Sequence, residues 1–339
     1  MQIYLYNSFF FCNFVPNYYC LYMIRLSIIV PFYNAEPYIE QCIRSLYNQD
    51  IPQEEYEVIC VDDCSPDGSR VIVERLQNEY STLRLLVHPK NKRQGGARNT
   101  GLKEAMGDYV WFVDSDDYLV PNCLGRLLRQ VEEDNLDLLK FYFQFDNGKT
   151  IVSESMMESD VCTGSQMIFE VITDIPLLRR CSSSVKQIIR RDFITVNSIY
   201  FAEGVQYEDD EYAYQLYACA ERVKSIAFAP YVVRLSANST TRRKNDLRRV
   251  QDIYAQALRM VGLRDKLTKG DTRWNEMIEM GIRDSFNNQM FRMLKDCSFK
   301  EQLHFWCVDR KNIHCFKPYL SRKAYVKLCS YIMWKLLQD

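Results

Sequence analysis

Leu26-Ser27-Ile28-Ile29-Val30 is a short, mostly apolar run that Pro31 ends. Such a run is typical of a strand buried on both faces of a parallel sheet. Segments with strand and helix patterns then alternate along the chain, which predicts an α/β domain with a mostly parallel, Rossmann-like sheet flanked by helices. We expect strands over 26–30, 56–61, 83–87 and 109–113, and helices over 37–46, 69–80, 95–105 and 124–132. Asn34 is the expected cap of the first helix.

The regular alternation fades after about residue 138. A further strand is predicted over 138–145, a turn over 146–148 and a helix over 212–220, and 246–338 has a mainly helical pattern. We therefore predict three parts: an extension over 1–22, an α/β domain over 23–241 and a helical C-terminal region over 242–339.

Composition excludes several classes of protein. The 43 Lys and Arg balance 44 Asp and Glu, which disfavours a nucleic-acid binder with a large basic face. No CxxC pair occurs among the 13 cysteines and there are only three histidines, so a zinc site is not predicted. We expect free thiols in a reducing cytoplasm. No run of about 18 apolar residues predicts a membrane-spanning helix.

Residues 1–22 are rich in aromatic side chains, but the first basic residue is Arg25. A secretory signal needs a positive start and a clean apolar stretch, which this segment lacks. We expect the natural start at Met23 and regard 1–22 as an upstream extension outside the domain.

Polar and aromatic groups follow three of the predicted strands. Pro31-Phe32-Tyr33-Asn34 follows the first, Asp62-Asp63 the second and Asp114-Ser115-Asp116-Asp117 the fourth. Ligands of open parallel sheets bind beyond the carboxyl ends of the strands. An aromatic ring and two groups of acids at this edge suit a catalyst that handles nucleotides.

Asp114 and Asp116 are two residues apart, so on an extended stretch both carboxylates point the same way. Mg²⁺ and Mn²⁺ bind a few carboxylates and complete their shell with phosphate oxygens. The alternative is an acidic cap for the helix over 124–132. The position after a strand, with Asp63 on the same edge, favours the metal site.

Two further sets of residues at this edge have two readings each. Asp62 and Asp63 suit either a strand-ending turn or hydrogen bonds to a uracil imide or a ribose. Tyr33 suits either stacking on a base or packing over the strand end. The sequence leaves both choices open.

Lys90-Asn91-Lys92-Arg93-Gln94-Gly95-Gly96-Ala97-Arg98-Asn99 opens a predicted helix with two glycines and four cations. Its backbone N–H groups and charge suit a diphosphate. Alternatively Arg98 pairs with Asp114 or Asp116, which we slightly favour. Neither GxxxxGK[ST] nor GxGxxG is present, which excludes the P-loop and dinucleotide readings.

Glu208-Asp209-Asp210-Glu211 precedes the helix predicted from Tyr212. Acids at a helix start often only complement the helix dipole. One of them could instead be a general base for an acceptor hydroxyl.

These residues together resemble a known family. The stretches Leu26-Ser27-Ile28-Ile29-Val30-Pro31-Phe32-Tyr33-Asn34, Val61-Asp62-Asp63-Cys64-Ser65-Pro66-Asp67-Gly68, Gly96-Ala97-Arg98-Asn99-Thr100-Gly101 and Phe112-Val113-Asp114-Ser115-Asp116-Asp117 are similar, in order, to the motifs of family-2 glycosyltransferases with the GT-A fold. A weaker similarity includes Glu203-Gly204-Val205-Gln206-Tyr207-Glu208-Asp209 and Tyr231-Val232-Val233-Arg234, so the resemblance covers about 26–241.

The resemblance implies inverting transfer of a sugar from a nucleotide-sugar, usually a UDP-sugar, to an acceptor hydroxyl. It implies a nucleotide-binding half over 23–135 and an acceptor half over 136–241. Mn²⁺ or Mg²⁺ would be the cofactor, bound by Asp116 and Asp114. Asp209 would be the base, with Glu208 as its rival. The donor nucleotide would contact Pro31, Tyr33, Asn34, Asp62, Asp63, Arg98, Asp114 and Ser115, with Pro31, Tyr33 and Asp63 at the base and Asp114 near the ribose.

The sequence departs from the family's pattern at two glycine positions, which hold Cys64 and Arg93. The QxxRW motif of processive synthases is absent, which favours a single transfer over polymerisation. The resemblance further suggests synthesis of a cell-surface polysaccharide or glycolipid, with a saccharide or lipid-linked saccharide as acceptor.

Two C-terminal features have alternative readings. Residues 236–244 suit a lid that closes on the diphosphate with Arg234 or Arg242, or a solvated loop. The helices over 242–339 suit a partner, a lipid-linked acceptor or a membrane surface, or are ordinary core and surface. A cytoplasmic protein, with the inner face of the membrane as an alternative, is expected.

Two rival functions remain. A sugar nucleotidyltransferase would share the acids and the sheet edge, but it usually has a glycine-rich basic loop after the first strand, where this chain has Pro31-Phe32-Tyr33-Asn34. A non-catalytic nucleotide-sugar binding protein is the other rival, and only an assay distinguishes it.

Overall fold

The computed structural model describes residues 23–147, 151–153, 156–181, 183–235, 246–267, 271–305, 313–326 and 329. The expected extension over 1–22, the expected lid over 236–244 and the domain boundary at 241 lie outside these residues, as does Gly148 of the expected turn.

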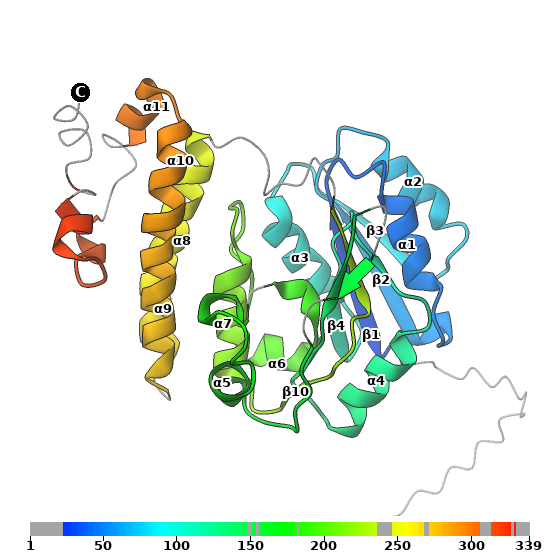
Figure 1. Cartoon of the computed structure of the whole chain (residues 1–339). Helices are drawn as coiled ribbons and strands as arrows, with labels where there is room; N and C mark the ends of the chain where they lie inside the picture. The colour runs from blue at the N-terminus through cyan, green and yellow to red at the C-terminus, as the bar shows by residue number, and fades with distance from the viewer. Residues whose placement is uncertain are drawn as a thin grey trace, which may run out of the picture.

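A seven-stranded, mostly parallel sheet forms the centre of the molecule, with strand order β10-β6-β9-β4-β1-β2-β3 (Figure 1). β1 pairs in parallel with β2 on one side and with β4 on the other, so these strands end at one edge of the sheet. β9 is antiparallel to both its neighbours. The strands are β1 (Leu26–Phe32), β2 (Tyr56–Asp62), β3 (Leu83–Val87), β4 (Tyr109–Phe112), β6 (Leu138–Lys140), β9 (Gln187–Arg190) and β10 (Val223–Ser225).

Helices cover both faces of this sheet, as the sequence predicts. Successive side chains of β1 point to opposite faces. Ile28 packs in a core with α1, α2 and α4, whereas Ile29 packs in a second core with α3, α6 and α7. The helices are α1 (Ile39–Tyr47), α2 (Ser69–Leu76), α3 (Arg93–Glu104), α4 (Leu124–Glu133), α6 (Arg191–Val196) and α7 (Asp209–Cys219), and α5 (Gly164–Gln166) is a single turn.

The strand predicted over 138–145 is wrong as one element. Residues 138–140 belong to the central sheet as β6, whereas β7 (Phe143–Asp146) belongs to a second sheet of order β5-β11-β7-β8. The chain changes sheets at Phe141 and Tyr142, whose N–H groups donate to the carbonyls of Lys186 and Phe228. The second sheet also contains β5 (Tyr118–Leu119), β8 (Ile151–Ser153) and β11 (Tyr231–Arg234).

The predicted start of the first helix is also wrong. α1 begins at Ile39, its N-cap is Tyr38, and no side chain caps it. Asn34 instead has a left-handed backbone with φ of 56° and turns the chain after β1. A turn between the strand and the helix therefore replaces a direct cap.

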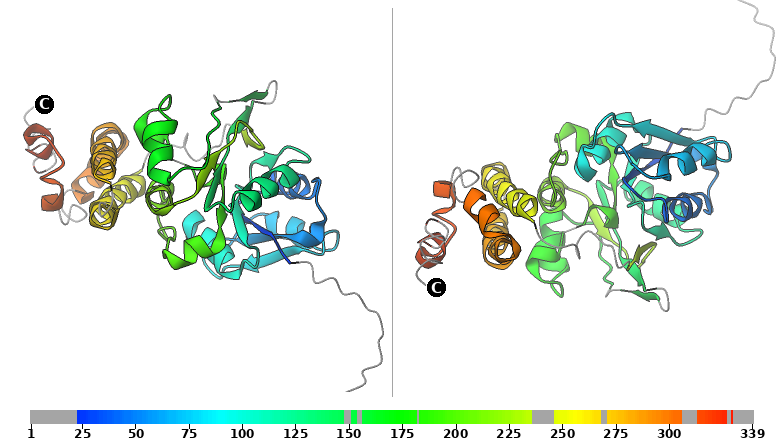
Figure 2. Two further views of the ribbon diagram at one scale, coloured as in Figure 1. Left: turned by 90° about the horizontal axis from the view of Figure 1, so that it is seen from below. Right: turned by 90° about the horizontal axis from the view of Figure 1, so that it is seen from above.

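The C-terminal part is helical, as predicted, and α8 packs against α7 (Figures 1 and 2). Buried side chains of α8, including Val250, Ile253 and Ala257, join the same apolar cluster as Tyr212 and Leu216 of α7. No helix within the described residues is long and apolar enough to cross a membrane. The helices are α8 (Leu247–Leu267), α9 (Arg273–Asp284), α10 (Phe291–Asp296) and α11 (Phe299–His304).

Both positions that lack a family glycine have the backbone conformation that glycine favours. φ is 66° at Cys64 and 64° at Arg93. A side chain in this left-handed region strains the backbone, most strongly for a β-branched residue. The loops thus keep a glycine-like course without glycine.

We expect Cys64→Val to lower the free energy of unfolding by roughly 1–2 kcal/mol relative to Cys64→Gly, because valine resists a positive φ. Cys64 is exposed, so lost packing does not confuse the comparison. Urea unfolding of the two variants measures the difference. Equal midpoints would contradict the assigned backbone conformation.

Candidate active site

The loops that follow β1 and β2 hold each other through hydrogen bonds. The Ala35 N–H donates to Ser69 Oγ at 2.8 Å, and the Gly68 N–H donates to Glu36 Oε2 at 2.9 Å. The exposed Asn34 donates its N–H to Ser65 Oγ at 3.3 Å. These contacts fix the course of the chain at the sheet edge where nucleotides are expected.

Tyr33 and Pro31 lie differently at this edge. The Tyr33 side chain is 53% exposed, which disfavours the reading in which its ring packs over the strand end. Pro31 is buried within β1, where it pairs with Val61. Tyr33 therefore has an exposed ring at this edge, whereas Pro31 is a buried part of the strand.

The paired acids after β2 have separate tasks. Asp62 Oδ1 accepts the Ser65 N–H at 2.8 Å, which is the turn-forming role. Asp63 is buried, and its Oδ1 accepts the Lys92 N–H at 2.7 Å and lies 2.8 Å from His88 Nδ1. Within the described residues no hydrogen bond reaches Asp63 Oδ2. That oxygen can still accept a further hydrogen bond.

His88 was not among the predicted site residues. Its Nε2 lies 2.9 Å from Thr100 Oγ1, so the ring links Asp63 to α3. Its position directly after the third strand is the signal that could have identified it.

Asp114-Ser115-Asp116-Asp117 form a turn, so the expected extended stretch is wrong. The Asp117 N–H donates to the Asp114 carbonyl at 3.1 Å. The alternative of a helix cap also fails, because β5 intervenes and the N-cap of α4 is Cys123. The directions of the Asp114 and Asp116 side chains are therefore set by the turn and not by the alternation of side chains along a strand.

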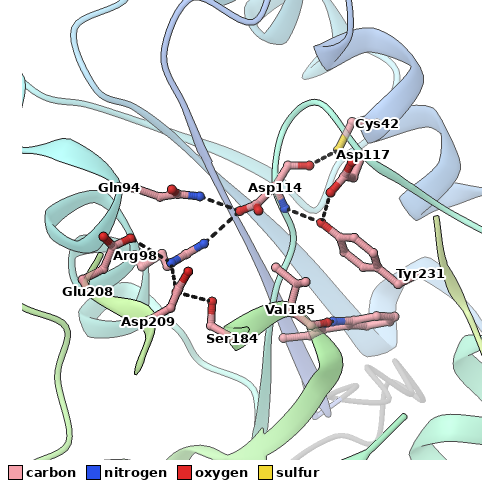
Figure 3. Close-up of polar contacts among 11 residues, drawn as sticks. Cys42, Gln94, Arg98, Asp114, Asp117, Ser184, Val185, Glu208, Asp209 and Tyr231 are labelled. Atoms are coloured by element: carbon pink, nitrogen blue, oxygen red, sulfur yellow. Dashed lines mark hydrogen bonds and ion pairs between the residues drawn. The ribbon is translucent and has the colours of Figure 1, made fainter. Parts of the chain in front are cut away.

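β11 holds this turn from the second sheet (Figure 3). Tyr231 Oη accepts the Asp114 N–H at 3.0 Å and donates to Asp117 Oδ2 at 2.7 Å. The Arg234 N–H donates to Asp117 Oδ1 at 2.8 Å, and Arg234 Nε donates to the Asp116 carbonyl at 3.0 Å. Burial and the charges of Asp114 and Asp116 raise the pKa of Asp117 to about 8. Asp117 is thus an internal support of the turn.

Arg98, on α3, lies at the centre of the site (Figure 3). Its guanidinium is buried and donates to three acids: to Asp114 at 2.9 Å, to Asp209 at 2.7 Å and to Glu208 at 3.2 Å. Burial alone would lower the pKa of Arg98, but the three carboxylates raise it above its ordinary value. The pairing with Asp114 is one of the two roles considered for Arg98, and it is present.

The two candidate bases differ in their access to solvent. Glu208 is buried, and burial together with Asp209 raises its pKa to about 7. The Asp209 side chain is 39% exposed, and its Oδ1 accepts from Arg98 and from Ser184 Oγ, the latter at 3.0 Å. Within the described residues no hydrogen bond reaches Asp209 Oδ2. Asp209 is therefore the acid that an incoming molecule can reach.

The chemistry of Asp114 and Asp116 fits a hard divalent cation. Burial and the charge of Asp114 raise the pKa of Asp116 to about 6. Asp114 Oδ1 is taken by Arg98 and by Gln94, the latter at 2.6 Å, which leaves Oδ2. No cluster of three or more His, Cys, Asp or Glu suited to a metal occurs among the described residues. Mg²⁺-type ions need only one or two carboxylates when substrate phosphates complete the shell. Ser115 lies between these acids, in the same turn.

We expect Asp210→Asn to raise thermal stability more at pH 8 than at pH 5. Burial and Asp209 raise the pKa of Asp210 to about 7, so the folded chain loses stability as pH rises from the ordinary carboxyl pKa through 7. Asparagine removes that loss and still accepts the hydrogen bond from Gln256. Melting temperatures at both pH values, with the exposed Asp192→Asn as control, test this. A stability gain that does not change with pH would contradict it.

Comparisons with known proteins identify relatives of this chain. Residues 27–188 match the family described as glycosyl transferase family 2. The chain is 34% identical over 219 residues to the uncharacterized glycosyltransferase EpsJ of Bacillus subtilis, which covers 64% of this chain and 62% of EpsJ. It is 31% identical over 210 residues to the poly(ribitol-phosphate) β-N-acetylglucosaminyltransferase TarS of Staphylococcus aureus, which covers 62% of this chain and 35% of TarS.

Solved structures share the fold. The structure of TarS 1–349 in complex with UDP-GlcNAc has a TM-score of 0.64 at 23% identity and covers 93% of this chain and 88% of that one. The mannosyltransferase PcManGT of Pyrobaculum calidifontis, in complex with GDP-Man and Mn²⁺, has a TM-score of 0.52 at 17% identity, with 93% and 86% covered. The matched part of the chain spans less than two thirds of EpsJ and of TarS. Residues 27–188 therefore form a glycosyltransferase family 2 domain, and the chain has the GT-A fold.

Proposed function

We propose that this protein transfers a sugar from a UDP-sugar to an acceptor hydroxyl with inversion. The observation that carries the proposal is the buried Arg98, which binds both Asp114 and the exposed Asp209. The Arg98 guanidinium therefore lies between the turn that starts at Asp114, which is expected to hold the diphosphate, and the Asp209 carboxylate, which is proposed to meet the acceptor. A donor held at the turn would have its sugar beside that carboxylate.

The donor nucleotide is proposed to bind at the ends of β1 and β2. The exposed ring of Tyr33 can stack on a base, and Asp63 Oδ2 can accept the imide N–H of uracil. The known complex of TarS with UDP-GlcNAc supports a UDP-sugar as the donor.

A divalent ion, Mn²⁺ or Mg²⁺, is proposed to be held by Asp116 and by Asp114 Oδ2. When bound, such an ion stabilises the negative charge that develops on the departing diphosphate. The Mn²⁺ of the PcManGT complex supports this cofactor. The β11 residues Tyr231 and Arg234 keep the turn in place for it.

Asp209 is proposed as the general base. It takes the proton of the acceptor hydroxyl through Oδ2 while Arg98 and Ser184 hold Oδ1 and thereby orient the carboxylate. The acceptor oxygen attacks the anomeric carbon on the face opposite the diphosphate, and a single displacement inverts that centre. Glu208 is too buried for this task, and its contact with Arg98 helps to keep the guanidinium in position.

The acceptor is proposed to be a saccharide or lipid-linked saccharide of a cell-surface polymer or glycolipid. The name of TarS, a poly(ribitol-phosphate) β-N-acetylglucosaminyltransferase, supports a polymeric acceptor. The absence of QxxRW supports one transfer per binding event.

We expect UDP and one UDP-sugar to raise the melting temperature in the presence of Mn²⁺, because only a ligand of the native state stabilises it. A thermal-shift screen of nucleotide-sugars measures this and selects the donor for the assays below. A screen in which no nucleotide or nucleotide-sugar shifts the melting temperature would contradict the proposed function.

We expect Asp209→Asn to lower the release of UDP from that donor, measured with water as the acceptor of the sugar, by roughly 10²- to 10⁴-fold while UDP binding persists, because the variant loses the base but keeps Arg98 paired with Asp114. Coupled UDP detection and calorimetric titration of UDP provide the two measurements. Asp192→Asn, an exposed acid at the start of α6, should have the activity of the wild type. Full activity of Asp209→Asn would exclude it as the base.

Asp116→Asn should raise the Mn²⁺ concentration needed for half-maximal activity at least about 10-fold, because it replaces a carboxylate with a weaker ligand of similar size. A titration of UDP release against Mn²⁺ measures this, and Asp192→Asn is again the control. An unchanged half-saturating concentration would show that Asp116 is not a ligand of the metal.

A further inference from the structure

Helix α8 presents four polar side chains to residues that flank the proposed active site. Arg249, Asp252, Gln256 and Arg259 are spaced by three, four and three residues, so they lie on one face of the helix. We call these four residues the polar face of α8. They lie outside the part of the chain that matches the family model, which ends at residue 188.

The polar face of α8 contacts the residues on either side of Asp209. Arg259 Nε donates to both carboxylate oxygens of Glu211, at 2.9 and 2.8 Å. Gln256 Nε2 donates to Asp210 Oδ2 at 3.3 Å. Ahead of Asp209, Arg249 Nε donates to Tyr207 Oη at 3.2 Å. The first turn of α7 is thus held by α8 on one side, while Arg98 contacts it from α3.

The same face reaches the start of the helix that carries Arg98. Asp252 Oδ2 lies 3.7 Å from Arg93 Nη1, at the first residue of α3. Arg93 and Tyr207 both have a φ of 64°, a conformation that costs energy for residues other than glycine. α8 therefore contacts both of these strained positions, each next to a segment that positions Asp209.

Packing alone does not explain the polar face. Its residues Arg249, Asp252 and Gln256 are each no more than 8% exposed. Asp252 Oδ2 and Arg259 Nη2 are buried without a hydrogen bond among the described residues, which costs stability. Apolar side chains would pack against α7 without this cost, as Val250 and Ile253 do.

We propose that the polar face of α8 positions the carboxylate of Asp209, so the C-terminal helices are part of the catalytic unit. This proposal rests on the proposed function. Arg259 and Gln256 touch neither donor nor acceptor in it; they act through Glu211 and Asp210, which fix the direction of the first turn of α7. Because the nucleotide binds on the other side of Arg98, the effect falls on turnover and not on donor binding.

The test uses the full chain and the UDP-sugar selected by the thermal-shift screen. We expect Arg259→Gln to lower kcat for UDP release about 10- to 100-fold, the effect of a slightly misplaced catalytic group, with KM for the donor unchanged. Arg259→Lys, which keeps a charge beside Glu211, should recover part of kcat. Gln256→Leu keeps the volume and loses only the hydrogen bond to Asp210, so it should lower kcat in the same direction.

Arg264→Gln is the matched control, because Arg264 lies on the same helix but donates to Asn275 and Tyr319 of the C-terminal region. It should leave kcat and KM at wild-type values. The melting temperature of each variant is measured alongside, and if Arg259→Gln does not fold, Gln256→Leu decides.

Two outcomes would overturn the proposal. In the first, Gln256→Leu and a folded Arg259→Gln both keep the kcat of the wild type. In the second, the control Arg264→Gln loses as much kcat as Arg259→Gln. Either would mean that α8 only supports the fold. A wild-type chain that releases no UDP would instead refute the proposed function. Loss of activity in Asp209→Asn with full activity in the α8 variants would refute this inference alone.

Discussion

The site depends on one buried cation, the guanidinium of Arg98, held among three carboxylates. A buried charge is tolerated only when partners compensate its lost hydration, and here Asp114, Glu208 and Asp209 do so. These acids come from the end of β4 and the start of α7, so Arg98, on α3, links these two elements. Any change in one acid alters the electrostatics of the other two.

Around this cation, carboxylates of similar sequence context have different tasks. Asp117 and Asp62 use their oxygens on backbone groups and a tyrosine, so they support turns. Asp116 and Asp209 are the acids proposed to bind an ion and an acceptor, and within the described residues no hydrogen bond reaches Asp209 Oδ2. Burial and partners, and not residue type, separate the structural acids from those proposed for chemistry. The polar face of α8 extends this support to the outer side of α7.

Much of the sheet edge was predictable from the sequence, because it rests on local signals. Apolar β-branched runs indicate the strands, and acids follow directly after two of them. Parallel pairing of β1 with β2 and β4 brings those acids to one edge of the sheet. The similarity to family 2 was visible in the same motifs. The glycine positions taken by Cys64 and Arg93 also have the positive φ that a family glycine would allow.

Sequence by itself thus determined the α/β class, the sheet edge with its acids and the helical character of the C-terminal part. Only the tertiary structure decided that Asp114 to Asp117 form a turn, that residues 138–145 divide between two sheets, and that Ser184, His88 and Tyr231 belong to the site. The two-sheet division and the places of Ser184, His88 and Tyr231 depend on hydrogen bonds between residues far apart in the chain, such as Ser184 with Asp209. The turn also depends on one, because Tyr231 holds Asp114 from the second sheet. The spacing of residues along the sequence does not predict such contacts, because they form only when separate elements pack together.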